Sequence, residues 1–357
     1  MILVRKAASW ILRIAALAAA SSFIATHFAW RQVAASFSRL QPLYLIPIVL
    51  FLSPAAVLLR SLRWRGLVPD GQRVPVLGYV RACLVGFLAN SLLPGKLGDL
   101  VKVRMICHPG VAYACSLGSA LIDRVLEGVA LLLILAPTAY FSDDAPAWVR
   151  GLALSAAAIA VCALLATAVL FRYRRAVLVW SKRPLRFLSS GVRKHVSTWL
   201  EALLAGFESM TSARRMLKAL AYSLAVWVLE LVIVCMFLAA FSVPAPRLLA
   251  AVLILVALNF GTLLPVSPGS VGIYQLLCVF ALSQWNVNRE LGFGMGLAMQ
   301  AVLFLPIYAA GLVCLIPMGA SRQSQSSAGT LGMKKISFST APTAAGTELQ
   351  RAVESGE

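Results

Sequence analysis

Charge is scarce in this sequence, and acidic residues are scarcer than basic ones. Of the 357 residues, 13% are charged and 60% are hydrophobic, whereas a soluble domain carries about 25% charged and 45–50% apolar residues. A soluble fold cannot bury so large an apolar fraction. The composition therefore excludes a soluble globular protein and predicts a polytopic membrane protein, in which helices satisfy their own backbone hydrogen bonds.

Patterns typical of metal sites and disulfide frameworks are also missing. The three histidines, at 27, 108 and 195, lie far apart in the sequence and form no H-E-x-x-H motif. The seven cysteines are odd in number, and no two of them are arranged as C-x-x-C. We therefore expect the cysteines to be small apolar core residues, and we expect no metal site and no cofactor.

The basic residues mark the expected cytoplasmic side. Thirty-two Lys and Arg against 13 Asp and Glu give a net charge of +19, and such an excess collects in cytoplasmic loops beside anionic headgroups. Two basic segments, 172–218 and 60–75, are expected to be such loops; the second includes Arg60 and Arg63. The acidic segment 141–150 is expected outside. Basic residues dispersed between apolar segments do not favour nucleic-acid binding.

Six segments have the length of a membrane-spanning helix, about 20 mostly apolar residues. They lie at 9–29, 41–60, 112–140, 151–171, 217–241 and 293–317. Arg5 and Lys6 precede the first segment, so it is either an uncleaved helix or a signal peptide. We prefer the uncleaved helix because no convincing cleavage site follows.

Two further apolar segments, 77–94 and 249–265, end in Leu-Leu-Pro followed by glycine-rich sequence. For basic and acidic loops to alternate across the membrane, 77–104 and 249–284 must each enter and leave on one side. The predicted fold is therefore an all-α membrane protein of about six full spans plus two re-entrant broken-helix elements, arranged as an inverted-topology repeat.

The predicted membrane domain covers 1–320, with halves at about 1–140 and 151–317. The tail 321–357 is rich in Ser, Ala, Gly and Thr and is expected to be disordered. Both termini are expected in the cytoplasm. Segment 186–216 mixes apolar and basic residues at near-helical spacing, so it is either an interfacial amphipathic helix or a plain connector.

The two interrupted segments share a motif. Both "ANSLLPGKLGDLVKV" (89–103) and "LNFGTLLPVSPGSVGIYQ" (258–275) contain Asn, then Leu-Leu-Pro, then Gly-x-x-Gly. Irregular backbone at membrane depth is tolerated only where protein buries it or a water-filled cavity solvates it. Proline breaks the helical ladder and glycine permits tight turning, so a new helix is expected after each Gly pair. The residues of the two breaks are Pro94, Gly95, Gly98, Pro265, Pro268, Gly269 and Gly272.

Free N–H groups at the start of each new helix favour an anion, and a lipid phosphate is an obvious ligand. Asn90 and Asn259 precede the breaks and are expected to cap freed backbone groups, or else to contact a headgroup. An alternative stays open, in which the breaks serve only helix packing. The other residues expected around this site are Lys96, Lys102, Arg104, Tyr274 and Gln275.

A few charged side chains lie deep within predicted spans, where they must face the bundle interior and find partners. Asp123 and Glu127 are four residues apart and share a helix face, and Arg124 can pair with Glu127 or bind a phosphate. A structural salt-bridge cluster and a substrate site are both compatible with this pattern. Glu230 is expected to bond a neighbouring helix rather than to couple transport to protons.

Three stretches together carry a family resemblance. They are "NSLLPGKLGDLVKVRMI", with Asn-x-x-Leu-Pro-Gly-x-x-Gly and an acidic residue; "ALIDRVLEGVALL", with an acidic-Arg-x-Leu element; and "LLPVSPGSVGIYQ", with Pro-x-x-Pro-Gly-x-x-Gly. In order and spacing they resemble the transmembrane domain shared with lysylphosphatidylglycerol synthases, the flippase-like family, over nearly the whole chain to about residue 320. Asp99 stands where the family more often has Glu. Gln275 also replaces a usual Glu, which removes a charge from that position.

The resemblance implies a lipid transporter or flippase, moving a phospholipid or an isoprenoid-type lipid such as a hopanoid between leaflets of the bacterial cytoplasmic (inner) membrane. The expected partners are membrane lipids with an anionic or phosphate-bearing headgroup, and further a second copy of the chain or lipid-synthesis enzymes. The sequence shows no aminoacyl-transferase domain like that of the synthases, so we expect it not to be an enzyme. Two alternatives stay open: an intramembrane lipid-modifying transferase with Asp99, Asp123 and Glu127 as its acids, and a non-transporting scaffold of a lipid-synthesis complex.

Overall fold

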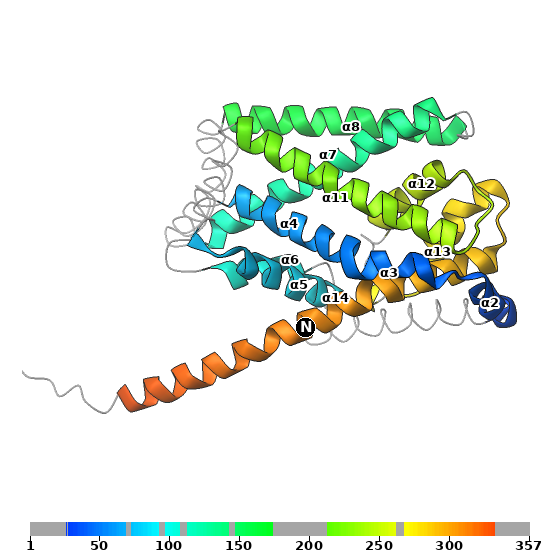
Figure 1. Ribbon diagram of the computed structural model, residues 1–357. Helices are drawn as coiled ribbons and strands as arrows, with labels where there is room; N and C mark the ends of the chain where they lie inside the picture. The colour runs from blue at the N-terminus through cyan, green and yellow to red at the C-terminus, as the bar shows by residue number, and fades with distance from the viewer. Residues whose placement is uncertain are drawn as a thin grey trace, which may run out of the picture. The chain divides into compact units, whose positions relative to one another are not determined.

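The chain is helical throughout the part that its computed structural model describes (Figure 1). The described residues are 26, 28–68, 73–92, 97–107, 113–142, 147–173, 213–261 and 268–332. No strand occurs among them. The prediction of an all-α fold is confirmed.

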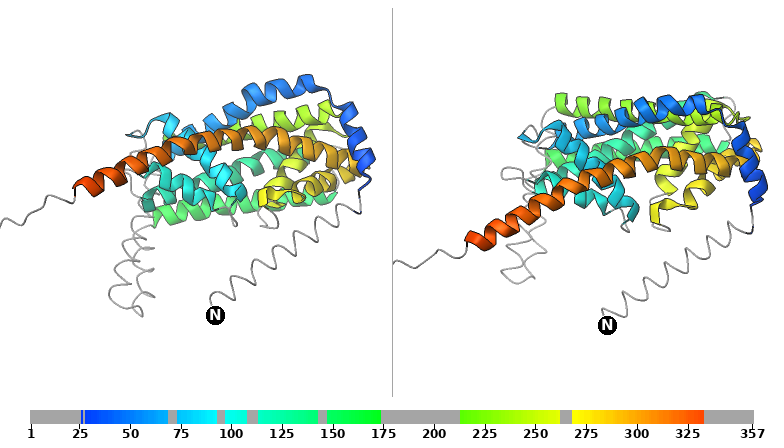
Figure 2. Two further views of the ribbon diagram at one scale, coloured as in Figure 1. Left: turned by 90° about the horizontal axis from the view of Figure 1, so that it is seen from below. Right: turned by 60° about the horizontal axis from the view of Figure 1, so that its bottom comes forward.

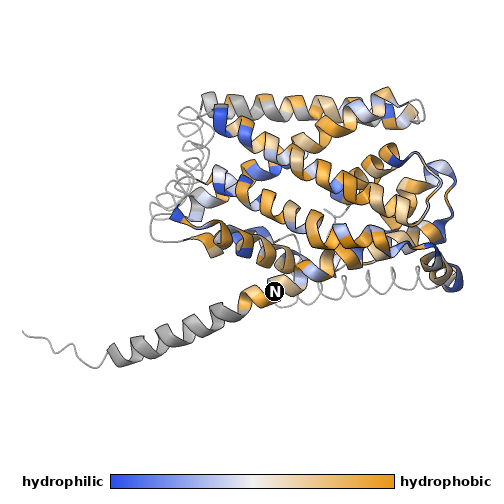
Figure 3. Ribbon diagram, in the orientation of Figure 1, coloured by the Kyte–Doolittle hydropathy of each residue, from blue (hydrophilic) through white to orange (hydrophobic). Residues whose placement is uncertain are grey.

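Three helical stretches among the described residues are long and apolar enough to cross a membrane. They are Pro42–Leu67, Arg214–Ala240 and Arg289–Leu315, and they correspond to the predicted spans at 41–60, 217–241 and 293–317. Hydrophobic residues run along most of the helices (Figure 3). The chain is a multi-pass membrane protein.

The first of these stretches begins irregularly. It passes through η2 (Pro42–Tyr44), α3 (Leu45–Pro47) and the π-helical turn η3 (Ile48–Leu52) before α4 (Ser53–Leu67). Pro54 has no N–H to donate to the carbonyl four residues earlier, so the regular ladder cannot form across this point. Beyond Pro54 the helix is regular to Leu67.

Three further long helices pack against α4 or against a helix that contacts it. They are α7 (Tyr113–Phe141), α8 (Ala147–Arg172) and α11 (Ala213–Ala240). α11 packs against α4 and α7, and α8 packs along α7 (Figures 1 and 2). α7 and α8 occupy the segments predicted as spans at 112–140 and 151–171. The largest buried apolar cluster includes Leu135, Phe237, Phe241 and Leu282, and it joins these helices to the segment 249–299.

Each interrupted segment forms a pair of packed helices. The first hairpin consists of α5 (Val76–Leu92) and α6 (Gly98–Ile106), and the second of α12 (Arg247–Gly261) and α13 (Ile273–Leu282). A 3-10 turn, η8 (Pro268–Ser270), lies in the described part of the second break. The new helices begin at Gly98 and directly after Gly272, as the Gly pairs predicted.

The two hairpins meet at their breaks. The end of α5 contacts η8, and a Cβ built on Gly269 would lie 4.0 Å from the Cβ of Ser91. The first part of α14 (Arg289–Gly332) contacts both hairpins. A Cβ on Gly311 would lie 2.9 Å from the carbonyl oxygen of Leu84, and one on Gly296 would lie 3.1 Å from the Cα of Gln275.

Several predictions concern residues outside the described part. These are most of the first span at 9–29, residues 186–212 of the connector, the acidic residues 143–144 and the tail after 332. By contacts the chain divides into two units, residues 1–314 and 315–357, and both hairpins lie in the first. α14 is helical to Gly332, past the predicted start of the tail at 321, and no proline interrupts that stretch.

The expectation that 60–75 forms a loop was wrong for its first part, whereas its cytoplasmic side stays a prediction. α4 continues through Arg60 and Arg63 to Leu67. Both arginines pair with carboxylates of neighbouring helices instead of facing water. Of the four arginines in that segment, two therefore carry no information on membrane orientation.

Candidate functional site

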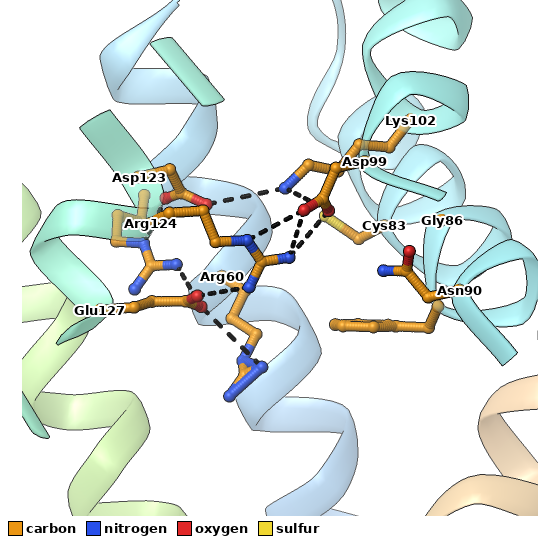
Figure 4. Close-up of a pocket in the computed structure, with 11 residues that line it drawn as sticks. Arg60, Cys83, Gly86, Asn90, Asp99, Lys102, Asp123, Arg124 and Glu127 are labelled. Carbon is orange, nitrogen blue, oxygen red and sulfur yellow. Dashed lines mark hydrogen bonds and ion pairs between the residues drawn. The ribbon is translucent and has the colours of Figure 1, made fainter. Parts of the chain in front are cut away.

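Eight charged side chains from four helices meet beside the first hairpin, and Figure 4 draws those that line the pocket there. We call them the charged cluster. Its members are Arg60 and Arg63 on α4, Asp99 and Lys102 on α6, Asp123, Arg124 and Glu127 on α7, and Glu230 on α11. Four members are basic and four are acidic, so the cluster is neutral as a whole.

Arg63 lies at the buried centre, and its side chain is 0% exposed. Its Nε donates to Asp123 Oδ1 at 2.6 Å, its Nη2 to Glu127 Oε1 at 2.7 Å and its Nη1 to Ser223 Oγ at 3.0 Å. Every nitrogen of the guanidinium has a partner. Such full pairing is what makes burial of the charge tolerable, because an unpaired buried charge costs several kcal/mol.

Helical spacing explains why these side chains meet. Arg60 and Arg63 are three residues apart on α4, and Asp123 and Glu127 are four apart on α7, so each pair occupies one face of its helix. α4 and α7 pack against each other. The face that presents two arginines therefore meets the face that presents two carboxylates.

Arg124 closes the exposed side of the cluster. Its Nε and Nη2 donate to the two carboxylate oxygens of Asp99 at 3.0 and 2.7 Å, and its Nη1 donates to Glu127 Oε2 at 2.6 Å. Its side chain is 42% exposed, against 25% for Asp99. The contact joins α6 of the first hairpin to α7. A guanidinium that donates two parallel hydrogen bonds to a carboxylate has a geometry that also fits a phosphate.

Lys102 lies deeper between the same helices. Its Nζ is 3.6 Å from Asp99 Oδ1 and 3.7 Å from Asp123 Oδ2, and it lies 4.8 Å from the centre of the Trp64 ring. The side chain is buried. A lysine placed between two carboxylates and an aromatic face is satisfied as it stands, so Lys102 does not flank the site as a free cation.

α11 joins the cluster through two contacts. Arg60 donates to Glu230 Oε1 through Nη2, which confirms that Glu230 bonds a neighbouring helix. Trp227 Nε1 donates to the backbone carbonyl of Glu127 at 2.8 Å. The cluster therefore ties α4, α6, α7 and α11 together through polar contacts.

A small pocket opens between the cluster and the first hairpin. Its cavity volume of about 20 Å³ is enough for one or two water molecules. Besides charged side chains it is lined by Cys83, Gly86, Phe87 and Asn90 of α5. A lipid headgroup does not fit this volume, so the cluster is closed in this conformation.

Asn90 caps the start of α6. The N–H of Gly98 donates to Asn90 Oδ1 at 2.8 Å, as predicted for a freed backbone group. Asn259 Nδ2 donates to the carbonyl of Leu255 within its own helix at 3.3 Å. Residues 262–267 of the break beside it lie outside the described residues, so capping by Asn259 stays a prediction.

In the second hairpin, a glutamine performs this capping. Gln275 Oε1 accepts the N–H of Gly272 at 2.7 Å, and Gln275 Nε2 donates to Gln300 Oε1 of α14 at 2.6 Å. Gln300 Nε2 donates to the carbonyl of Gly269 at 2.7 Å. Tyr274 is buried and packs edge-on against Phe304.

The structure divides the predicted site residues into three groups. Around the pocket it brings together Asn90, Asp99, Lys102, Asp123, Arg124 and Glu127, with Gly98 bonded to Asn90. The residues that do not line this pocket are Arg104, which is exposed on α6, and Asn259, Pro268, Gly269, Gly272, Tyr274 and Gln275 of the second hairpin. Pro94, Gly95, Lys96 and Pro265 lie outside the described residues.

The sequence did not predict three residues of the charged cluster and of the hydrogen bonds around Gln275. The charge of Arg60 and Arg63 favours a loop, although no helix breaker separates them from the apolar run before them. Their spacing of three matches the face of Asp123 and Glu127, which is the signal that could have found them. Gln300 carries no comparable signal, because a single glutamine in an apolar helix has many possible partners.

Comparison with known families gives one result. A family model described as "Lysylphosphatidylglycerol synthase TM region" matches residues 10–311. This range contains both hairpins and all eight members of the charged cluster. Comparison with curated proteins and with solved structures gives no match.

Proposed function

The chain belongs to the family of the lysylphosphatidylglycerol synthase transmembrane region, and from this premise we propose that it moves a lipid between membrane leaflets. The resemblance drawn from the sequence motifs is confirmed by the match. The family is that of a membrane region related to lipid handling. One observation carries the proposal: a neutral, closed charged cluster beside a broken helix, with a single half-exposed arginine as its outermost member.

The proposed topology has about six full spans and two re-entrant hairpins in an inverted repeat. Helix lengths support it. α5 and α6 have 17 and 9 residues, and α12 and α13 have 15 and 10. At 1.5 Å per residue all four are shorter than the roughly 30 Å of hydrocarbon that a span must cross. We propose that hairpins of this length turn back within the membrane, where α5 contacts η8.

The headgroup enters, in this proposal, by exchanging partners with the ion pair of Arg124 and Asp99. A phosphate replaces the Asp99 carboxylate on the Arg124 guanidinium, since both groups present two oxygen acceptors to the same two N–H donors. This exchange separates α6 from α7 and enlarges the pocket. The acyl chains stay in the lipid, and movement of one half against the other exposes the site to each leaflet in turn.

The charge balance of the cluster indicates which lipid headgroups it should prefer. The cluster is neutral before the exchange, so a headgroup of net negative charge gives it a net negative charge and leaves Asp99 with Lys102, at 3.6 Å, as its remaining cation. A phosphate-bearing headgroup that also carries an amine can place its ammonium against Asp99 and keep the cluster neutral. Burying an unpaired charge is expensive, so we propose that amine-bearing headgroups are preferred to purely anionic ones.

We further propose that the chain transports lipid without modifying it, in the bacterial cytoplasmic membrane, with both termini inside. The orientation rests on the basic segment 172–218. Asp99, Asp123 and Glu127 are each engaged by one or more cations at 2.6–3.7 Å, an arrangement suited to holding and exchanging ion pairs.

The test is lipid exchange in liposomes that contain the purified protein. Fluorescent phosphatidylethanolamine and phosphatidylglycerol analogues are followed between leaflets by bleaching of the outer leaflet. Arg124→Ala is expected to slow exchange of both by about tenfold or more, because charge-assisted hydrogen bonds contribute about 1.5–3 kcal/mol each and about 1.4 kcal/mol is tenfold. Asp99→Asn is expected to slow only the amine-bearing analogue.

Arg31→Ala provides the matched control, since Arg31 is exposed on α2 (Trp30–Ser36) and outside the cluster. It should exchange lipid as the unmodified protein does. All variants are first compared for melting temperature. If the unmodified protein speeds exchange of no host lipid class, the transport proposal is wrong, and a scaffold or transferase role takes its place.

A further inference from the structure

The second hairpin holds a chain of buried amide groups whose direction is fixed at both ends. At one end the donor is the N–H of Gly272, so the atom of Gln275 that faces it must be the oxygen. At the other end the acceptor is the carbonyl of Gly269, so the atom of Gln300 that faces it must be the nitrogen. The remaining nitrogen of Gln275 and oxygen of Gln300 then meet at 2.6 Å.

We propose that Gln300 is a positioning residue for the second hairpin, and that the amide chain requires a neutral hydrogen-bond donor at position 275. Gln275 supplies that donor permanently. A protonated carboxylic acid could also supply it, with its carbonyl oxygen toward Gly272 and its O–H toward Gln300. A carboxylate could not, because it has no hydrogen to donate.

The backbone turn that the two glutamines bind has an unfavourable conformation. Gly269 has φ +62°, Ser270 φ +57° and Gly272 φ +88°. Positive φ angles occur in three of four consecutive residues, and they are unfavourable for an L residue such as Ser270. The two glutamines bind the carbonyl before Ser270 and the N–H two residues after it, so they fix both sides of the turn.

A close approach of α14 to α13 places Gln300 beside Gln275. Gly296 lies one helical turn before Gln300, and a Cβ there would approach Gln275 Cα to 3.1 Å and Cys278 Sγ to 3.2 Å. The absence of a side chain lets α14 approach α13 closely. Gln275 is 1% and Gln300 9% exposed, so water does not replace their contacts.

A charge at position 275 would find no counter-charge among the described neighbours. The described polar contacts of Gln275 are the Gly272 N–H and Gln300, and neither is a cation. The titratable groups that interact with the adjacent Tyr274 are Cys278 on α13, Tyr308 on α14 and Glu230 on α11, and Glu230 is acidic and already paired with Arg60. An anion at 275 would therefore face Gln300 Oε1 at about the present 2.6 Å with no cation beside it.

The test is thermal unfolding of the full chain in detergent as a function of pH. Gln275→Glu is expected to lower the melting temperature by about 2–4 °C at pH 8, an order set by one buried hydrogen bond lost and its acceptor left unsatisfied. The folded state favours the protonated acid more strongly than the unfolded chain does. The loss should therefore shrink as the pH falls toward 5, where the variant binds its proton.

Two further variants separate the proposal from a general packing defect. In Gln275→Glu/Gln300→Lys the introduced ammonium can donate to both the introduced carboxylate and the carbonyl of Gly269. The melting temperature should therefore recover at pH 8 and lose its pH dependence relative to the unmodified protein. Gln32→Glu, at an exposed position of α2, should show neither effect.

Three outcomes would overturn the proposal. The first is a Gln275→Glu variant as stable as the unmodified protein at pH 8, and the second is a loss of stability that does not change with pH. The third is a double variant that stays equally unstable. None of these outcomes depends on lipid transport.

Discussion

At the residue scale, we expect a large loss of stability on replacing Arg63, because its charge has no access to water. Replacing it with methionine keeps most of the side-chain volume but leaves Asp123 short of its closest partner and Glu127 with one fewer. Breaking a buried ion pair from one side costs about 3–5 kcal/mol. Arg63→Met should therefore lower the free energy of unfolding by about that amount, measured by denaturant titration in detergent.

Whether charge causes that loss can be checked by also removing Asp123, the carboxylate that loses its closest cation. Arg63→Met/Asp123→Asn should recover a large part of the stability, since the cluster then has three cations and three carboxylates and Glu127 keeps Arg124. Arg31→Met, at an exposed site, should stay within about 0.5 kcal/mol of the unmodified protein. A double variant no more stable than the single one would mean that packing, and not charge, sets the cost.

The sequence predicted the acidic half of the cluster better than the basic half. Asp123, Arg124 and Glu127 stand out as charges within an apolar helix, and the rule that such charges must pair applies to them directly. Arg60 and Arg63 lie at the end of an apolar run, where a loop beside headgroups is the ordinary interpretation. Only the packing of α4 on α7 distinguishes the two cases, and that packing is a property of the tertiary structure.

At the element scale, Gly98 decides whether the first hairpin can close. A Cβ on Gly98 would clash with the carbonyl oxygen of Gly86 and lie 2.6 Å from the backbone nitrogen of Asn90, and backbone atoms cannot rotate away as a side chain can. Gly98→Ala should therefore push α6 from α5, break the Asn90 cap and lower stability by about 1–3 kcal/mol. Unfolding in detergent measures this loss.

Gly151→Ala is the matched control for this change. Gly151 is also helical, and a Cβ there would meet nothing within 4 Å. Its replacement should be neutral or stabilising, since Ala favours a helix over Gly by up to about 1 kcal/mol. If both variants lost stability equally, a general intolerance of the helices to alanine would explain the result, and the close approach at Gly98 would not.

The positions of the helix breaks could be predicted because proline and glycine act on the backbone locally. Each new helix begins where the Gly pair placed it, at Gly98 and after Gly272. The capping partners could be predicted only in part. Asn90 accepts the Gly98 N–H, eight residues further along the chain. The second hairpin is instead capped by Gln275, which bonds Gln300, 25 residues further along the chain on another helix.

At the scale of the whole molecule, the re-entrant topology makes a prediction that ordinary spans do not. Leu92 ends α5 at the break of the first hairpin and is exposed on the surface of the protein. If the hairpin turns back within the membrane, a cysteine at this position lies near the midplane. It should then react slowly with a membrane-impermeant maleimide added from either side of the membrane, in a background without the native cysteines.

Trp148→Cys is the reference in the same background, because Trp148 is exposed near the start of α8, next to the acidic segment expected outside. It should react quickly from the outside alone. Fast outside labelling of Leu92→Cys at the rate of Trp148→Cys would mean that α5 crosses the membrane completely. A pair of full spans would then replace the first re-entrant hairpin, and the contact between the two breaks would have to lie at the outer surface, where exchange of a headgroup at the midplane could not occur. Slow labelling would instead place both breaks within the hydrocarbon region, where unpaired backbone groups require the caps that Asn90 and Gln275 provide.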